Sequence, residues 1–153
     1  MSIKRRVLLT CFIVLAVFSV SLLTYTLYIT LGITRATRSI TISLLHVETN
    51  ENESKAYFPL TIYNPSNVQL ELFFLRMNVY FNSTYLGKKE SNFENNPISL
   101  SPNVEANLTV SLVLDNPASY SNGVWELDLT VILETPLPQT ARISRSISLG
   151  ENS

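Results

Sequence analysis

A chain of 153 residues has room for one domain of ordinary size plus a short additional segment. All twelve Asp and Glu residues and eight of the eleven Lys and Arg residues lie after residue 33, so that part carries a net charge of −4 without His46 and the C-terminus. A mildly acidic domain lacks the basic surface of nucleic-acid-binding proteins, and no nucleic-acid partner is expected. The one cysteine, Cys11, precedes this domain, which therefore forms no disulfide of its own.

An uninterrupted apolar run covers residues 7–32 and contains no charged residue, Pro, Asn or Gln. Crossing a bilayer takes about 20 such residues, so the run predicts one transmembrane helix. Three basic residues at 4–6 precede the run, and Arg35 and Arg38 follow it. The larger positive charge before the run predicts a cytoplasmic N-terminus.

A cleaved signal peptide is the alternative, because it also combines a basic start with an apolar run. Its apolar segment is only about 7–15 residues long and ends at a small-residue cleavage site. Here the run continues through Leu22, Leu23, Tyr25 and Tyr28, which favours an uncleaved anchor. The chain is then divided into a basic cytoplasmic N-terminus (1–6), a transmembrane helix (7–32), a linker (33–38), an extracytoplasmic domain (39–150) and a tail (151–153).

One face of the predicted helix carries Ser21, Thr24 and Tyr28, which are spaced at i, i+3 and i+7. Such side chains can hydrogen-bond to a second helix, although Ser and Thr also bond to the carbonyl of residue i−4 in their own helix. These three residues are the candidate helix–helix contact, and both readings stay open. Tyr25 and Tyr28, near the end of the run, suit the headgroup region of a bilayer.

After the helix, apolar and polar residues alternate, as they do in half-buried strands. The clearest case is residues 125–134, where Trp125 and every second residue after it are apolar. Residues 106–114 and 142–149 repeat the pattern, and Arg145 interrupts the apolar row of the last one, as in a strand near a sheet edge. Further strands are predicted at residues 39–47, 56–63, 69–74, 77–81 and 84–88. We expect an all-β, seven-stranded fibronectin-III/immunoglobulin-like sandwich after the one transmembrane helix.

Three segments between the strands are predicted as turns or loops. Asn82-Ser83 is expected to form a turn, and the polar residues 48–55 are expected to form a long hairpin loop. Residues 135–138 contain two prolines, which remove two amide donors, so this segment is expected to be an exposed corner.

Asn-x-Ser/Thr triplets begin at Asn52, Asn82 and Asn107, all after the predicted anchor. Each is a candidate N-glycosylation site if the domain is extracytoplasmic, although such triplets also arise by chance in polar sequence. Asn107 falls on the polar side of a predicted strand.

The sequence is poor in groups for catalysis. It has one His, four Gly and no G-x-S-x-G, H-E-x-x-H or glycine-rich phosphate loop. A hydrolase using His46, Glu51 or Glu53 would be the only enzymatic form, and loop carboxylates are more often simply solvated. No catalytic residue, cofactor or metal site is therefore predicted.

Residues 56–116 also resemble the water-stress and hypersensitive-response domain, also called the late-embryogenesis-abundant type 2 domain. The resemblance rests on LTIYNPSN at Leu60–Asn67, MNVYFNSTYLGK at Met77–Lys88 and LSPNVEANLTVSLVL at Leu100–Leu114. The Asn-Pro-Ser-Asn turn departs from the family's Asn-Pro-Asn by one inserted residue. The resemblance implies a fibronectin-III-like sandwich, a membrane helix in many members and no catalytic site, but no site residues.

Together these features predict a non-enzymatic interaction or structural protein, held in the plasma membrane by a single pass. We expect its partners to be the lipid bilayer and another membrane or cell-surface protein, with the chain as an accessory subunit of a larger complex. An archaeal pilin or archaellum-like filament subunit, or a filament-associated protein, is the alternative, because those chains also join an apolar helix to a β-sandwich. Here Val7 directly follows the basic residues, with no small residue at the expected processing site.

Overall fold

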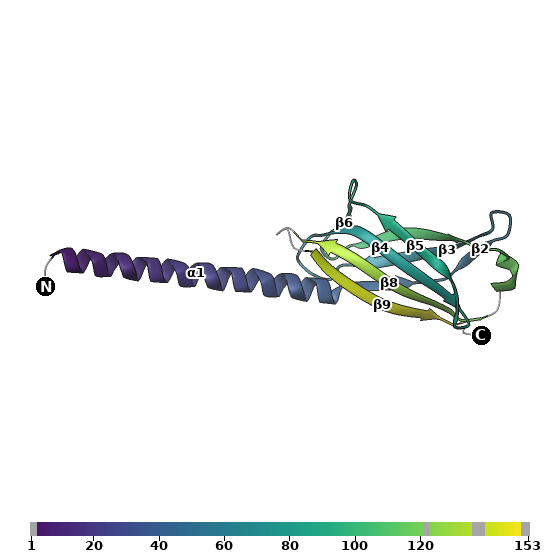
Figure 1. The fold of residues 1–153 in the computed structure, drawn as a ribbon, viewed down its shortest axis with the longest axis horizontal. Helices are drawn as coiled ribbons and strands as arrows, with labels where there is room; N and C mark the ends of the chain where they lie inside the picture. The colour runs from purple at the N-terminus through teal and green to yellow at the C-terminus, as the bar shows by residue number, and fades with distance from the viewer. Residues whose placement is uncertain (1–2, 121–122, 136–139, 151–153) are drawn as a thin grey trace. The chain divides into compact units, whose positions relative to one another are not determined.

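The computed structural model describes residues 3–120, 123–135 and 140–150 (Figure 1). The predicted corner at 135–138, apart from Thr135, and the predicted tail at 151–153 lie outside these ranges. The chain forms two compact units, residues 1–35 and residues 36–153, which are taken separately below.

The first element is the helix α1, Ile3–Ser39. Its stretch Leu9–Ser39 is long and apolar enough, by length and composition, to cross a membrane, and its most apolar part is not buried within the structure. The helix continues through residues 33–38, for which the sequence predicted a linker. That segment is polar but holds neither Pro nor Gly, so nothing in its composition ends a helix.

Within the described residues the second unit contains nine strands and one short 3₁₀ helix, η1, Pro117–Tyr120. The strands are β1 (Thr41–Leu44), β2 (Glu48–Asn50), β3 (Lys55–Tyr63), β4 (Leu70–Phe81), β5 (Thr84–Asn92), β6 (Ile98–Leu100), β7 (Glu105–Val113), β8 (Trp125–Glu134) and β9 (Thr140–Leu149). They form two antiparallel sheets, β1/β2-β3-β7 and β5/β6-β4-β8-β9. The all-β sandwich is thus confirmed.

The count of nine strands replaces the predicted seven, and the register explains the difference. β1 and β2 pair with opposite ends of β3, and β5 and β6 pair with different parts of β4. Nine described strands therefore occupy seven positions, three in one sheet and four in the other. In chain order the third position is β4 and the fourth is β5/β6, which pairs with β4 in the same sheet. In immunoglobulin constant domains the fourth strand belongs to the other sheet.

The core lies between the two sheets and is made by the apolar positions of the alternating strands. Leu127, Leu129, Val131 and Leu133 of β8 are each at most 1% exposed, and their neighbours in sequence face outward. β3 and β4 contribute most of the rest of the core, including Phe58.

β4 is one continuous strand where the sequence predicted two. Its register with β8 shifts between Leu72 and Phe74, so Phe73 is an extra, bulged residue whose carbonyl accepts a hydrogen bond from the Phe93 amide at 2.7 Å. Because one extra residue reverses the alternation, Leu72 and Leu75 both face the core.

The turn after β4 is the predicted one. Asn82 and Ser83 have φ values of 49° and 65°, and Phe81 pairs with Thr84 across them. Two left-handed residues in a two-residue loop form a type I′ turn, whose twist suits a hairpin.

Candidate functional site

The outer face of the four-position sheet carries several aromatic and charged side chains that contact one another. Alternate residues of β4 and β5 point away from the core there, and four of them, Phe74, Arg76, Tyr80 and Tyr85, are called the interaction face below. Cross-strand partners share a face of an antiparallel sheet, so the pairs Tyr80–Tyr85 and Arg76–Glu90 come together through the β4–β5 register.

Direct contacts order these side chains. The rings of Tyr80 and Tyr85 lie 5.4 Å apart, and Tyr85 is 53% exposed. The Arg76 guanidinium lies 5.8 Å from the centre of the Phe74 ring and donates a 2.9 Å hydrogen bond to Glu90. Tyr, Phe and Arg are the residue types enriched at protein interfaces, and here their side chains contact one another or a neighbouring carboxylate.

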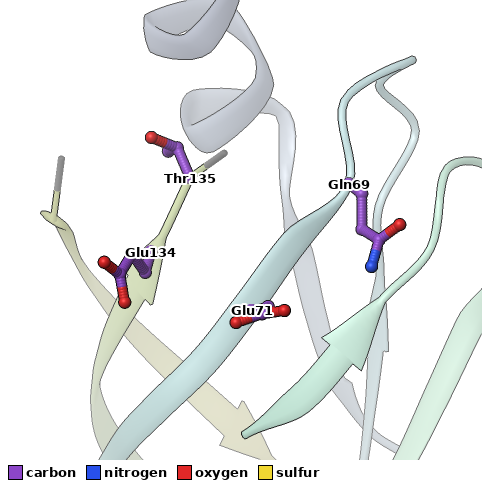
Figure 2. Close-up of a pocket in the computed structure, with 4 residues that line it drawn as sticks. All are labelled: Gln69, Glu71, Glu134 and Thr135. Carbon is purple, nitrogen blue, oxygen red and sulfur yellow. The ribbon is translucent and has the colours of Figure 1, made fainter. Parts of the chain in front are cut away.

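A pocket of about 420 Å³ opens where β4 begins and β8 ends, lined by Gln69, Glu71, Glu134 and Thr135 (Figure 2). Glu71 and Glu134 are direct partners in the β4–β8 ladder, so two carboxylates share one face. Like charges in this arrangement repel each other, which a basic group of a partner would relieve. In the described part of the chain no group of three or more His, Cys, Asp or Glu residues could hold a metal ion.

The predicted helix–helix residues lie on one exposed face of α1. Ser21 donates to the Val17 carbonyl at 2.9 Å and Thr24 to the Val20 carbonyl at 2.7 Å, while Tyr28 is 78% exposed. The two hydroxyl protons are therefore used within the helix, although each oxygen can still accept a bond from a neighbour. Contact with a second helix through this face stays a prediction.

A second row of hydroxyl residues lies on the opposite side of α1. Ser19, Thr26 and Thr30 are spaced at i, i+7 and i+11, which aligns them on a helix of about 3.6 residues per turn. Between flanking leucines they leave a shallow apolar groove of about 580 Å³. The sequence shows this spacing as well, alongside that of Ser21, Thr24 and Tyr28.

The three candidate glycosylation asparagines are all exposed. Asn52 lies in the turn between β2 and β3. Asn82 lies in the β4–β5 turn and accepts a hydrogen bond from the Val124 amide at 2.9 Å. Asn107 lies on β7 and accepts one from the Thr61 hydroxyl at 3.0 Å.

The residues of the hydrolase alternative do not share one cluster of contacts. His46 lies 2.6 Å from Glu48, and both are exposed. Glu53 bonds instead to Lys55 and Tyr57, and Glu51 is exposed in the same turn. The predicted loop at 48–55 is shorter than expected, because Glu48–Asn50 forms β2 and only the turn 51–54 remains.

Glu53 is the centre of a small exposed network. Hydrogen bonds from Tyr57 and then Lys55 stabilise its carboxylate and lower its pKa from the usual 4.5. A lowered pKa means that the ionised group stabilises the fold above the pKa of the unfolded chain. That contribution is lost as the pH falls through the pKa of the folded chain.

We expect Tyr57→Phe to raise the pKa of Glu53 towards its ordinary value, because the phenol makes the largest contribution to the shift. The acid dependence of stability should become weaker in this variant. An NMR pH titration of the Glu53 side chain would measure the shift. Tyr63→Phe, on the same face of β3, is the control and should leave the Glu53 pKa unchanged; an unchanged pKa in Tyr57→Phe as well would contradict the assignment.

The two antiparallel sheets form a fibronectin-III-like β-sandwich domain, which follows an apolar helix in the chain. No family model matches this chain, and no curated protein matches it. Among solved structures, a protein assigned as ApaA from Bordetella pertussis is 11% identical, with a TM-score of 0.53, over 74% of this chain and 94% of its own. At this identity the likeness shows the fold alone.

Two further solved structures match with lower TM-scores. A protein from Arabidopsis thaliana is 15% identical over 72% of this chain and 77% of its own, with a TM-score of 0.47. A protein assigned as late embryogenesis abundant is 10% identical over 83% and 86%, also with a TM-score of 0.47. Membership of that family stays a prediction.

Proposed function

We propose that this chain is a single-pass membrane protein that holds a non-enzymatic β-sandwich at a membrane surface, where the sandwich binds another membrane or cell-surface protein. The observation that carries the proposal is α1, whose stretch Leu9–Ser39 is long and apolar enough to cross a membrane and whose most apolar part is not buried within the structure. Exposed apolar area on this scale is unfavourable in water, whereas a bilayer accommodates it.

The proposed orientation is N-terminus in the cytoplasm and sandwich outside, in the plasma membrane. The three basic residues at 4–6 support this orientation. The exposure of Asn52, Asn82 and Asn107 is also compatible with a glycoprotein. Protease protection in sealed vesicles tests the orientation directly. The sandwich should be digested in right-side-out vesicles, where the extracytoplasmic face of the membrane meets the added protease, and protected in inside-out vesicles.

Anchoring predicts a large effect of charge at the centre of the helix. Val17→Arg/Val20→Arg places two charges in the apolar run, each costing about 2.5–3.5 kcal/mol at the middle of a bilayer. We expect the unchanged chain to stay with membranes in alkaline carbonate extraction and flotation, and the double variant to leave them.

Val113→Arg is the matched control, because Val113 is as exposed as Val20, at 69% against 64%, but lies on the sandwich. This variant should stay with membranes. Release of the unchanged chain by carbonate would contradict the proposed anchor.

The interaction face supports the binding half of the proposal. Gentle detergent extraction followed by native electrophoresis should show the unchanged chain in a larger complex, as expected of an accessory subunit. Tyr80→Ser/Tyr85→Ser should shift it to the size of the free chain, whereas Thr130→Ala, on the same sheet face but outside the interaction face, should not. Migration of the unchanged chain only as a free monomer would count against this role.

A further inference from the structure

Arg38 near the end of α1 and two arginines of β9, Arg142 and Arg145, line one cleft of the second unit. The cleft has a volume of about 250 Å³ and lies where the last turn of α1 adjoins β9; it is lined by Thr37, Arg38, Arg142, Ile143, Ser144 and Arg145. All six residues belong to the compact unit 36–153. We call this the arginine cleft.

The register of β9 explains how Arg145 reaches the cleft, whereas Arg142 leaves the strand on the opposite, outer face beside the edge. β9 is an edge strand, paired only with β8 among the described strands, and Arg145 occupies the position opposite the buried Leu129. A charged side chain cannot remain in the core row, and the Arg145 guanidinium instead donates to the Arg38 carbonyl at 3.4 Å. That carbonyl is among the last four of α1, which have no partner within the helix.

Among the described residues, the arginines of the cleft have no ion-pair partner. Elsewhere on the sandwich Lys55, Arg76 and Lys88 each pair with a glutamate. Within the described residues no carboxylate forms an ion pair with Arg38, Arg142 or Arg145, although residues 36–153 contain seven Lys and Arg against twelve Asp and Glu. The C-terminal end of a helix contributes only about −0.5 charge, which offsets a small part of three guanidinium groups.

We propose that the arginine cleft binds an anionic phosphate group. Arginine suits this ligand because its planar group donates two parallel hydrogen bonds to phosphate oxygens, and Arg145 has used one of its five donors. Thr37 and Ser144, two residues with hydroxyl groups, also line this cleft. The phosphate is that of an anionic lipid headgroup or free inorganic phosphate.

The position of the cleft in the chain favours the lipid, and this step rests on the proposed function. Arg38 follows Gly32, the end of the apolar run, by six residues, which span at most about 22 Å even when fully extended. If the run crosses a bilayer, the cleft therefore lies within reach of its headgroups. A phosphate bound there would help to fix the sandwich at the membrane surface.

The test uses the full chain in neutral detergent micelles. Thermal unfolding is followed by the fluorescence of Trp125, the one tryptophan, while phosphatidylglycerol, zwitterionic phosphatidylcholine or inorganic phosphate is added. We expect phosphatidylglycerol to raise the unfolding temperature of the unchanged chain more than phosphatidylcholine does, because a ligand of the folded state stabilises it.

Charge removal in the cleft should weaken this effect. Each neutralised arginine is expected to lower the affinity about fivefold, so Arg38→Gln/Arg142→Gln should need about 25 times more phosphatidylglycerol. Lys89→Gln removes one charge elsewhere on the sandwich and should leave the response unchanged. If the double variant does not fold, Arg142→Gln and Arg142→Lys replace it, because the Arg142 side chain makes no hydrogen bond within the described residues.

The outcomes separate the possibilities. An equal rise with inorganic phosphate, lost in the variant, assigns the cleft to free phosphate, and a rise with the anionic lipid alone assigns it to the headgroup. Equal responses to both lipids, or an unchanged response in the variant, overturn the proposal. If the proposed membrane anchor is wrong, carbonate extraction will show it independently, because that experiment does not involve the arginine cleft.

Discussion

Replacing Phe58 with alanine is expected to lower the free energy of unfolding by about 3–5 kcal/mol, the usual cost of removing a large buried aromatic side chain. Phe58 is 0% exposed, at the end of the sandwich where four aromatic rings meet. Its ring makes an edge contact with Trp125 at 5.6 Å, and Trp125 also contacts Phe81 at 5.0 Å and Tyr120 at 5.9 Å.

The expected loss is large because this cluster joins the two sheets. Phe58 comes from β3 in one sheet, Phe81 and Trp125 come from β4 and β8 in the other, and Tyr120 comes from η1. A domain of this size has a total stability of about 5–15 kcal/mol, so one substitution removes a substantial fraction of it. Protein interiors are closely packed, so removal of the ring leaves a cavity that the neighbouring rings fill only in part.

Urea unfolding followed by Trp125 fluorescence measures this effect. Phe74→Ala is the control, because Phe74 is the same residue type on the outer face and loses mainly its contact with Arg76. It should cost about 1 kcal/mol or less. Similar losses in the two variants would show that the aromatic cluster contributes little to the joining of the sheets.

The strands that could be predicted from the sequence are those with an uninterrupted alternation. Residues 125–134 were predicted with the bounds of β8, because their apolar residues occupy every second position. β4 was predicted as two strands, 69–74 and 77–81, because the bulge at Phe73 that keeps the alternation in phase with β8 depends on the partner strand. β6 was not predicted, because its three residues are too few to show an alternation of apolar and polar side chains.

The helix shows a different limit. Residues 33–38 were predicted as a linker because they are polar, yet Ala36 and Thr37 are buried within the second unit and the helix continues to Ser39. The polar residues indicate where the apolar run ends, but they do not end the helix, because residues 33–38 contain no Pro or Gly to interrupt it.

Sites formed by residues that are far apart in the chain could not be predicted from the sequence. Arg145 was noticed as an interruption in an apolar row, but its contact with Arg38 joins residues 107 positions apart. In the same way Glu71 and Glu134 meet only through the β4–β8 register. The asparagine turn resembling a family motif was recognised, whereas its role in the fold became clear only from its contacts.

That role concerns Asn64, a polar residue that is 0% exposed. Its side-chain nitrogen donates to the carbonyls of Val68 and Leu100, both at 2.8 Å, and its side-chain oxygen accepts from the amide and hydroxyl of Ser66. Its own backbone carbonyl accepts from the Asn103 amide at 2.7 Å. One side chain thus connects the turn after β3 to the end of β6, and its backbone connects that turn to the loop before β7.

Asn64→Ala is therefore expected to lower the free energy of unfolding by about 1–3 kcal/mol, because the buried Leu100 carbonyl loses this donor. The Val68 carbonyl can still accept from the Ser66 hydroxyl at 3.1 Å. Urea unfolding of the full chain, followed by Trp125 fluorescence, measures the change. Asn67→Ala is the matched control: Asn67 lies in the same turn but is exposed and makes no side-chain hydrogen bond within the described residues, so its loss should stay within about 0.5 kcal/mol. If both asparagines cost the same, the turn is stabilised by its backbone conformation and the Asn64 network is not what holds these segments together.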